Sequence, residues 1–232
     1  MNATPVLFIT GTDTEVGKTV TTAAIAAALA TRGAAGIAVD KPTQTGVLPG
    51  EAGDVQEAQR LSGVKPISEG VRLRAPMAPV AAALREGATL PSMHAHVTRI
   101  RSLAARHERV LVEGAGGLLV QLDNNGNTLA ELAAEFGSAA SVIVVCRSGL
   151  GTLNHTALTL EALHHRGLHI AGLVIGSWPE RPTAVELDNR QHFSARNSKL
   201  GVPLLGAIPA RAAQLAPQEF RARAQHWLPL LR

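Results

Sequence analysis

The sequence predicts an α/β fold in which a mostly parallel sheet is covered by helices on both faces. Short apolar runs alternate with helical segments along the chain, and runs such as 141–146 are almost entirely apolar. Strands buried on both faces have this character, and their alternation with helices is typical of parallel sheets. No low-complexity block, internal repeat or domain boundary is recognisable, so residues 1–232 are expected to form a single domain.

Apolar runs and helix signals assign the elements in order. Strands are predicted at Val6–Thr10, Gly36–Asp40, Arg109–Glu113, Ser141–Cys146, Ile170–Ile175 and Pro203–Ile208. Helices are predicted at Lys18–Arg32, Asp54–Ser62, Val80–Glu86, Ser92–His107, Thr128–Phe136, Thr152–Arg166, Ala184–Asn197 and Pro217–Leu230, with Ser92 as an N-cap. Residues 43–46 are expected to form a loop, and the stretch 63–79, which is punctuated by Pro and Gly, is expected to be irregular.

The composition argues against several classes of protein. The hydrophobic fraction of 46% with 17% charged residues is typical of a globular protein. The net charge of +4 comes from scattered basic residues and the aromatic fraction is 3%, so neither a basic arm nor a base-stacking surface for nucleic acid is predicted. The single cysteine, Cys146, excludes an intramolecular disulfide. Neither a signal peptide nor a membrane span is recognisable, and a cytoplasmic protein is expected.

The strongest local signal is the segment Thr10–Thr19, which follows the first apolar run. It contains Gly11, Gly17, Lys18 and Thr19 in nearly the G-x-x-x-x-G-K-[ST] pattern of a P-loop, with five residues between the glycines where that pattern has four. The N–H groups of such a turn and the helix N-terminus behind it bind phosphate. We therefore expect Lys18 to reach the outer phosphates of a nucleotide and the Thr19 hydroxyl to bind Mg²⁺. A glycine turn with an unrelated lysine is the alternative, but the flanking strand and helix favour the P-loop.

Reactive residues at strand ends are candidates for the chemistry, because ligands of open parallel sheets bind at the carboxyl ends of the strands. Only four of the 22 basic residues are lysines, and both Lys18 and Lys41 follow predicted strands. A lysine offers a compact ammonium group at a position where this chain would otherwise use arginine. Lys41 is therefore predicted to act in chemistry and not in folding; a solvated loop lysine is the alternative.

A carboxylate stands at the end of the third predicted strand. Glu113 is followed by Gly114–Gly117, whose lack of bulky side chains allows phosphate or backbone to come close. Mg²⁺ prefers carboxylates together with phosphate oxygens, so Glu113 is predicted to bind Mg²⁺ directly or through water. Asp54 is a weaker candidate, because an aspartate at a helix start usually serves as a cap.

Other conspicuous features have simple alternatives. The turn Gly149–Asn154 could bind a second anion, such as a carboxylate, or could be an ordinary strand-to-helix turn. His94 and His96 fall on different faces of a helix and do not predict a metal site. Cys146 is not preceded by a glycine elbow and is predicted to be part of a strand core.

Together these motifs resemble the dethiobiotin synthetases, which are P-loop ligases of biotin synthesis. The resemblance rests on the longer loop Gly11–Thr19, on Lys41–Thr45, on Asp54, on Val-Glu-Gly-Ala-Gly-Gly at Val112–Gly117 and on Leu-Gly-Thr-Leu-Asn-His at Leu150–His155. Leu204–Pro209 also resembles the last strand of that family, so the resemblance covers nearly the whole chain.

The resemblance implies an ATP-dependent ligase that converts 7,8-diaminononanoate and CO₂ into dethiobiotin. An amine would be carboxylated to a carbamate, the carbamate would attack the γ-phosphate of ATP, and the second amine would close the ureido ring. The implied catalytic residues are Lys41, Lys18, Thr14 and Glu15. The implied Mg²⁺ ligands are Thr19, Asp54 and Glu113.

The resemblance also implies binding residues and a partner. The substrate would contact Thr14, Lys41, Thr45, Gly117, Leu150, Gly151 and Asn154. In the family the carboxylate tail of the substrate reaches the equivalent of Leu150–Asn154 from the partner subunit, which suggests a homodimer with shared sites. The nucleotide would contact Gly11, Glu15, Val16, Gly17, Lys18, Thr19, Val20, Asp54, Glu113, Gly114, Ala115, Gly116, Gly176, Ser177, Pro209, Ala210 and Arg211.

One position departs from the family. After the strand Ile170–Ile175 the family commonly carries an Asn that reads the adenine edge, and the matching position here is Gly176. Glycine has no side-chain donor or acceptor, so a relaxed choice among ATP, CTP, GTP and UTP is expected. Backbone groups near Gly176 or Pro209–Arg211 could restore selectivity.

Rival P-loop classes fit the sequence less well. A partition-type ATPase typically carries an extra lysine near the start of the loop, which residues 10–16 lack. A GTPase would need an Asn-Lys-x-Asp guanine reader, and the sequence contains no Asn-Lys pair. A P-loop switch or regulator without ligase activity is the alternative function, although it gives Lys41 no reason to be at its position.

Overall fold

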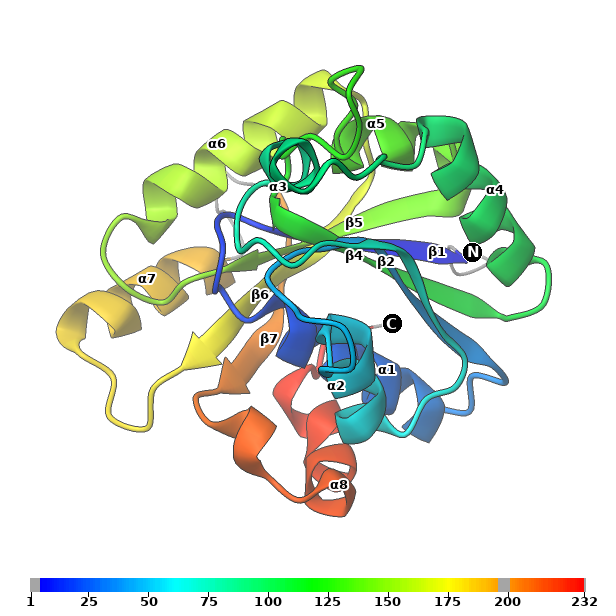
Figure 1. Cartoon of the computed structure of the whole chain (residues 1–232). Coiled ribbons are helices and arrows are strands. Elements are labelled where there is room, and N and C mark those ends of the chain that lie inside the picture. The colour runs from blue at the N-terminus through cyan, green and yellow to red at the C-terminus, as the bar shows by residue number, and fades with distance from the viewer. Residues whose placement is uncertain (1–4, 196–200, 232) are drawn as a thin grey trace.

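Parallel strands form the centre of the fold, and helices cover both faces of their sheet (Figure 1). The computed structural model describes residues 5–195 and 201–231. In these ranges the sheet has seven strands in the order β3-β2-β4-β1-β5-β6-β7, and all neighbours pair in parallel. The strands are β1 (Val6–Gly11), β2 (Ile37–Gln44), β3 (Ile67–Arg72), β4 (Arg109–Gly117), β5 (Ala140–Cys146), β6 (Ile170–Trp178) and β7 (Leu204–Pro209). The predicted α/β architecture is confirmed.

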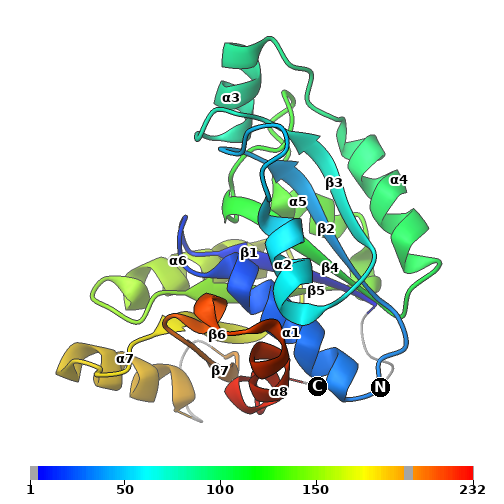
Figure 2. The same cartoon turned by 60° about the horizontal axis from the view of Figure 1, so that its bottom comes forward.

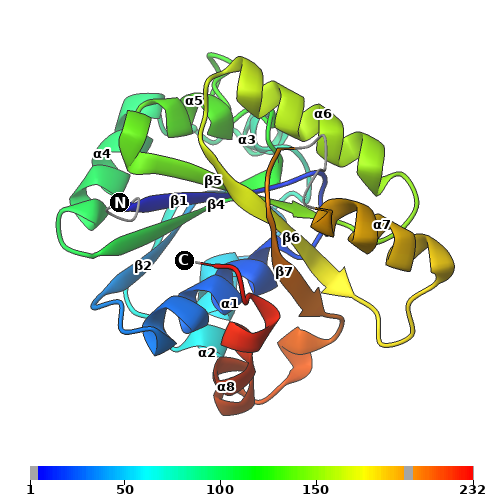
Figure 3. The same cartoon turned by 180° about the vertical axis from the view of Figure 1, so that it is seen from behind.

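The helices form a layer on each face of the sheet. On one face α1 (Lys18–Thr31), α2 (Asp54–Ser62) and α8 (Pro217–Trp227) lie side by side (Figure 2). The other face is covered by α4 (Met93–Ala104), α5 (Leu129–Ala134), α6 (Thr152–His165) and α7 (Ala184–Ser194) (Figure 3). The remaining elements are α3 (Pro79–Glu86) and two short 3₁₀ helices, Gly137–Ala139 and Ala212–Gln214. In the described ranges no helix combines the length and apolar character that a bilayer span requires.

α1 is buried along most of its length because it lies between the sheet and two other helices. Its contacts are with α2, α8 and several strands, and the alanines at 23, 24, 26, 27 and 28 are almost completely buried. A helix that is apolar all round is found in protein interiors, and alanine lets its backbone approach the sheet closely. The start of α1, which follows the predicted P-loop, is therefore held firmly against the end of β1.

β2 is longer than the sequence predicted. It was expected to end at Asp40, with a loop at 43–46, but the strand continues to Gln44. Its pairing with β4 stops at Asp40, whereas its pairing with β3 continues to Gln44. Pro42, which has no N–H to donate, therefore lies beyond the β4 ladder. The loop prediction is wrong for its first two residues, and Lys41 lies inside a strand.

β3 was missed because an edge strand need not be apolar. The stretch 63–79 was predicted to be irregular, yet it contains Ile67–Arg72, with the sequence Ile-Ser-Glu-Gly-Val-Arg. All six residues are half-buried, since the strand has a neighbour on one side only. β4 and β6 also run past their predicted ends, to Gly117 and Trp178.

Capping residues set the starts of several helices. Ser92 accepts a hydrogen bond from the N–H of Ala95, and Thr128 is the N-cap of α5 and not its first residue. α4 ends at Ala104, earlier than the predicted His107, because the chain must already turn toward β4. α5 and α8 likewise end before their predicted limits, at residues 134 and 227. The predicted end of α7 at Asn197 lies outside the described residues.

A buried polar chain ties α4 to β2. Arg99 donates to both carboxylate oxygens of the fully buried Asp40, at 2.8 and 3.1 Å, and to Nδ1 of His96 at 3.0 Å. Burial, and then the positive charge of Arg99, lowers the pKa of the fully buried His96 to about 4, although the nearby charge of Asp123 acts in the opposite direction. His96 is therefore neutral in the folded protein at pH 7.

This arrangement predicts a loss of stability in acid. The unfolded chain binds a proton at His96 below pH ~6.5, whereas the folded chain does so only near pH 4, so stability is lost as the pH falls through this window. Between pH 7 and pH 5 the wild type should lose about 2 kcal/mol more unfolding free energy than His96→Gln. Urea unfolding at both pH values measures this difference. The exposed His164→Gln variant should behave like the wild type, and an identical pH response of all three proteins would contradict the prediction.

Candidate active site

The loop between β1 and α1 has the geometry of an anion-binding turn. Glu15 and Gly17 adopt left-handed backbone conformations, with φ of 54° and 93°. A Cβ at Gly17 would lie 2.4 Å from the carbonyl oxygen of Gly176, so only glycine fits where the end of β6 approaches the loop. Nζ of Lys18 donates to the carbonyl oxygen of Asp13 at 2.9 Å, so the ammonium group lies across the loop.

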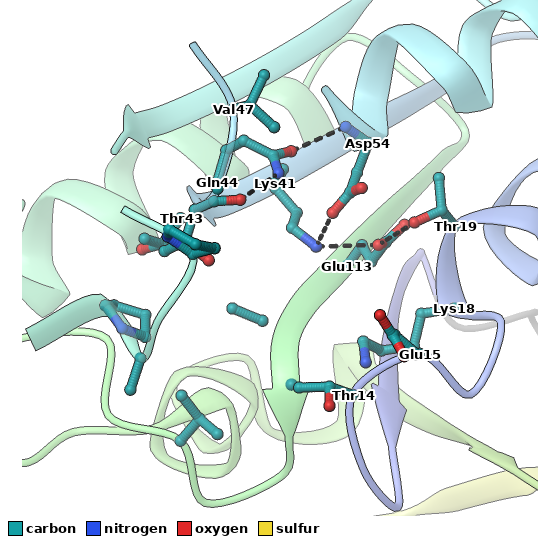
Figure 4. A pocket seen from close by; sticks show the side chains of 18 of the residues that line it. Thr14, Glu15, Lys18, Thr19, Lys41, Thr43, Gln44, Val47, Asp54 and Glu113 are labelled. Atoms are coloured by element: carbon teal, nitrogen blue, oxygen red, sulfur yellow. Dashed lines mark hydrogen bonds and ion pairs between the residues drawn. The ribbon is translucent and has the colours of Figure 1, made fainter. Parts of the chain in front are cut away.

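Lys41 is the centre of a buried charge cluster beside this loop (Figure 4). Its Nζ lies 2.5 Å from Oδ2 of Asp54 and 2.9 Å from Oε1 of Glu113, and it also donates to the carbonyl oxygen of Gly114 at 3.0 Å. The hydroxyl of Thr19 donates to the same Oε1 of Glu113 at 2.8 Å. β2, β4, α2 and the first turn of α1 each contribute one of these side chains. The structure therefore brings together four residues that the sequence singled out separately.

Lys41 and Asp54 keep each other ionised. Burial alone would lower the pKa of Lys41, but Glu113 and Asp54 outweigh burial and raise this pKa above its usual value. Burial would raise the pKa of Asp54, yet Lys41 holds it below its usual value. Burial, and then the charge of Lys41, lowers the pKa of Lys18 to about 8. Lys41 and Glu113 are only 3% and 1% exposed, so loss of the ammonium group would leave buried carboxylates without a cation.

The cluster opens onto a cavity of about 730 Å³. The predicted site residues that line it are Thr14, Glu15, Gly17, Lys18, Thr19, Val20, Lys41, Thr45, Asp54, Glu113, Ala115 and Gly116. Sequence reasoning missed a further part of the wall, which consists of Thr43, Gln44, Gly46, Val47, Pro76, Met77, Ala78, Pro79 and Val120. The proline pair that brackets residues 76–79, just before α3, is the only signal that could have pointed to this segment.

The predicted base-binding residues lie at the ends of β6 and β7. Gly176 is buried against the P-loop, whereas Ser177 is exposed. The N–H of Ala210 donates to the carbonyl oxygen of Trp178 at 2.7 Å, which joins the two strand ends, and Arg211 adopts a left-handed conformation with φ of 67°. Gly176 approaches the P-loop, but none of these residues lines the cavity beside Lys41.

The turn before α6 is separate from the cavity of its own chain. Leu150, Gly151 and Asn154 are all exposed and none of them lines the cavity. The side-chain amide of Asn189 holds the turn by donating to the carbonyl oxygens of residues 148 and 149, at 2.8 and 3.1 Å. Gly117, at the end of β4, pairs with Gly11 beside the P-loop.

The other conspicuous residues have structural roles. Cys146 is fully buried in β5, and burial raises its pKa to about 12, which is unsuited to a nucleophile. His94 is exposed while His96 is buried, as their spacing predicted. No group of three or more His, Cys, Asp or Glu side chains gathers around a common point in the described ranges. The hydroxyl of Thr19 and the carboxylates of Asp54 and Glu113 are oxygen donors beside the loop, of the kind that can hold a divalent cation next to a phosphate.

Comparisons with known proteins agree on a family. A family model described as an AAA domain matches residues 6–218. The ATP-dependent dethiobiotin synthetase of Streptomyces coelicolor is 50% identical over 224 residues, which cover 97% of this chain and 92% of that protein. The enzyme of the same name from Mycobacterium avium is 51% identical, with 94% of this chain and 92% of that protein covered. A third, from Parafrankia, is 51% identical over 93% of this chain and 88% of that protein.

Solved structures support the fold alone. The septum site-determining protein MinD from Pyrococcus horikoshii, solved with Mg-ADP, has a TM-score of 0.57 and 19% identity, with 99% of this chain and 95% of that chain covered. A ParA family ATPase from Chlorobium tepidum has a TM-score of 0.54 and 13% identity, with 99% and 93% covered. The P-loop NTPase-like architecture predicted from the sequence is therefore confirmed.

The buried cluster predicts that Lys41 contributes to stability. Lys41→Gln would leave the carboxylates of Asp54 and Glu113 adjacent and without a cation, which should cost about 3 kcal/mol of unfolding free energy. Urea unfolding at pH 7.5 measures this loss. Lys65→Gln is the matched control, because Lys65 is exposed and its removal should change stability by less than about 0.5 kcal/mol. Equal stability of the two variants would show that Lys41 plays no part in folding.

Proposed function

The chain belongs to the family of ATP-dependent dethiobiotin synthetases, and we propose that it closes the ureido ring of dethiobiotin from 7,8-diaminononanoate, CO₂ and ATP. It is thus an ATP-binding ligase of biotin synthesis. We propose that residues 1–232 act as one ligase domain. The observation that carries the proposed chemistry is the ammonium group of Lys41, held by two carboxylates beside a P-loop. A switch ATPase has no need of this cluster, and the relatives at about 50% identity carry the synthetase name.

The proposed reaction has three steps. One amine of the substrate attacks CO₂ and loses a proton, which gives a carbamate. A carbamate oxygen attacks the γ-phosphorus of ATP, and the bond from that phosphorus to the oxygen of ADP breaks. The second amine then attacks the carbamate carbon, phosphate leaves, and a proton is lost as the ring closes. Negative charge builds up on the carbamate and the transferring phosphoryl group, so fixed cations stabilise these steps.

The two buried lysines supply these cations. We assign Lys18 to the outer phosphates, whose oxygens would replace the carbonyl oxygen of Asp13 as its partner. Lys41 is assigned to the carbamate, because it lies on the cavity wall and its raised pKa keeps it charged. Thr14 and Glu15 line the same cavity next to Lys18 and are assigned to orient the reacting groups.

Mg²⁺ is the proposed cofactor, and Thr19, Asp54 and Glu113 would hold it. The donor set fits this ion because it consists of one hydroxyl and two carboxylates, and Mg²⁺ is usually bound by one or two carboxylates plus the phosphates of its substrate. When bound, the ion would offset negative charge on the β- and γ-phosphates. Lys41 forms ion pairs with both carboxylates. The same side chain would therefore orient the two proposed metal ligands and contact the proposed carbamate.

The rest of the cavity suits a diamine with an alkyl chain. Thr45 lines the wall near Lys41 and is assigned to the amine end of the substrate. Val47, Pro76 and Met77 line the same cavity and offer apolar surface for methylene groups.

The carboxylate tail of the substrate is assigned to the turn before α6 of a second subunit, together with Gly117. Leu150 is 91% exposed, and neither it nor Asn154 lines the cavity of its own chain. Leu153 and Leu158 extend this exposed apolar surface along α6. A homodimer would cover this surface and bring a free helix N-terminus to the anionic tail. We propose that this dimer acts in the cytoplasm.

Phosphate release by the purified protein tests the proposed reaction. Release should require both 7,8-diaminononanoate and bicarbonate, and dethiobiotin should form in the same amount as phosphate. Omission of either compound should leave only slow background hydrolysis of ATP. Release at an equal rate without the diamine would point to the alternative, a P-loop ATPase without ligase activity.

Mixed subunits test the shared site. Lys41→Gln damages the reaction centre, and Asn154→Ala damages the turn that would serve the partner. A hybrid dimer of the two variants would contain one site with both parts intact, so activity should return when the inactive variants are mixed. Hybrids that form but stay inactive would mean that each site is built within one chain.

Gly176 predicts a relaxed choice of nucleoside triphosphate. A Cβ there would lie 2.0 Å from the carbonyl oxygen of Val16, so no side chain that could read adenine fits at this position. The loss of two base hydrogen bonds, at about 1 kcal/mol each, reduces discrimination roughly ten- to thirtyfold. ATP should therefore be used with a kcat/KM close to those for CTP, GTP and UTP. A preference for ATP above about a hundredfold, or roughly 2.7 kcal/mol, would show that Ser177 or Pro209–Arg211 still reads the base.

A further inference from the structure

Asp54 stands in the first turn of α2, whose N-cap residue, Gly53, has no side chain with which to cap the helix. Asp54 is the first residue of α2, and Gly53 occupies the N-cap position. The first N–H groups of a helix have no partners within it and must bind other groups. Here the N–H of Asp54 donates to Oε1 of Gln44 on β2 at 2.8 Å, and the N–H of Gly53 donates to Oε1 of Gln56 at 2.8 Å. The cap that fixes Asp54 therefore comes from the strand that carries Lys41.

Gln44 is buried and hydrogen-bonded at the start of α2. The residue is 3% exposed, and both ends of its side-chain amide are hydrogen-bonded, because Nε2 donates to the carbonyl oxygen of Thr45 at 3.1 Å. A Cβ at Gly53 would lie 2.8 Å from Oε1 of Gln44, so glycine at the N-cap lets the amide reach the helix. Figure 4 shows the amide of Gln44 directed toward Asp54 beside the lysine cluster.

Asp54 needs such an anchor more than Glu113 does. The side chain of Glu113 is 1% exposed in the middle of the central strand β4, whereas that of Asp54 is 33% exposed at a helix start. The ion pair with Lys41 holds the carboxylate of Asp54, but Lys41 must also serve the carbamate during the proposed reaction. The hydrogen bond from the backbone N–H of Asp54 to Gln44 does not involve Lys41, so it would hold the backbone of Asp54 in place even if that ion pair were broken.

We propose that Gln44 is a positioning residue of the metal site, which fixes the backbone of Asp54 so that its carboxylate faces the cation. The inference rests on the proposed function, since it deepens the role of Asp54 in that site. Groups that orient a metal ligand typically change metal affinity by about 10- to 100-fold when they are removed.

Mn²⁺ titration of the protein–ADP complex, followed by electron paramagnetic resonance, tests the proposal without turnover. Gln44→Leu keeps much of the side-chain volume and removes both hydrogen bonds, so Mn²⁺ should bind about tenfold more weakly. The Mg²⁺ concentration for half-maximal phosphate release should rise by a similar factor. In Gln44→Asn the side chain is shorter and its amide cannot reach Asp54, so this variant should behave in the same way. It replaces Gln44→Leu as the test variant if Gln44→Leu does not fold.

Gln56→Leu is the matched control. It removes the cap of the neighbouring N–H group at the same helix start but no contact with Asp54. This variant should lower the Tm as the Gln44 variants do and leave Mn²⁺ affinity unchanged. An equal loss of Mn²⁺ affinity in both would mean that any loosening of α2 has this effect, and would overturn the proposal.

A double-mutant cycle shows whether Gln44 acts through Asp54. In an Asp54→Asn background, Gln44→Leu should cause no further loss of Mn²⁺ affinity, because the ligand that it orients is already gone. A second tenfold loss, or wild-type Mn²⁺ affinity in folded Gln44→Leu, would overturn the proposal. A wild-type protein that binds Mn²⁺ and ADP but releases no phosphate with the substrates would contradict the proposed function and leave this inference standing.

Discussion

The buried ammonium group of Lys41 is the interaction on which the site depends. An isolated charge inside a protein is costly, and the cost is offset only when opposite charges lie at hydrogen-bond distance. Asp54 and Glu113 meet this need at 2.5 and 2.9 Å, from a helix and a strand that are distant in sequence. The pairing fixes α2 against β2 and β4, and Thr19 attaches the start of α1 to the same carboxylate. One electrostatic requirement thus sets the relative positions of the proposed metal ligands and the proposed catalytic lysine.

The strand order decides which chemistry lies on which side of the P-loop. β1, which leads into the loop, lies between β4 and β5. On the β4 side, β4 and β2 supply Glu113 and Lys41, which carry the proposed chemistry. On the other side, β6 and β7 end in the residues assigned to the base, and the close contact of Gly17 with Gly176 joins the two halves. The same close approach leaves no room for a side chain at Gly176, so the proposed phosphate turn and the proposed choice of base depend on one contact.

Local signals predicted most of the fold and part of the site. Lys18, Glu113 and Lys41 could be found because parallel strands expose their carboxyl ends at one edge, and each residue follows an apolar run. β3 could not be found, because a polar edge strand is stabilised by its neighbour and not by its own composition. The extension of β2 could not be found either, because beyond Asp40 this strand pairs only with β3. Gln44 was missed for a related reason: its role depends on the start of α2, ten residues away, which no local pattern reveals. The burial of Lys41, on which its predicted contribution to stability rests, also follows only from packing.

The rate of ring closure in Lys41→Gln tests the central claim most directly. It should be measured in a single turnover, with diamine and nucleotide saturating and at a temperature where the variant is folded. If Lys41 stabilises the carbamate and the transferring phosphoryl group, the rate should fall by at least about a hundredfold, while nucleotide affinity stays near that of the wild type. Ring closure at nearly the wild-type rate in folded Lys41→Gln would contradict the claim and leave Lys41 with a purely structural role.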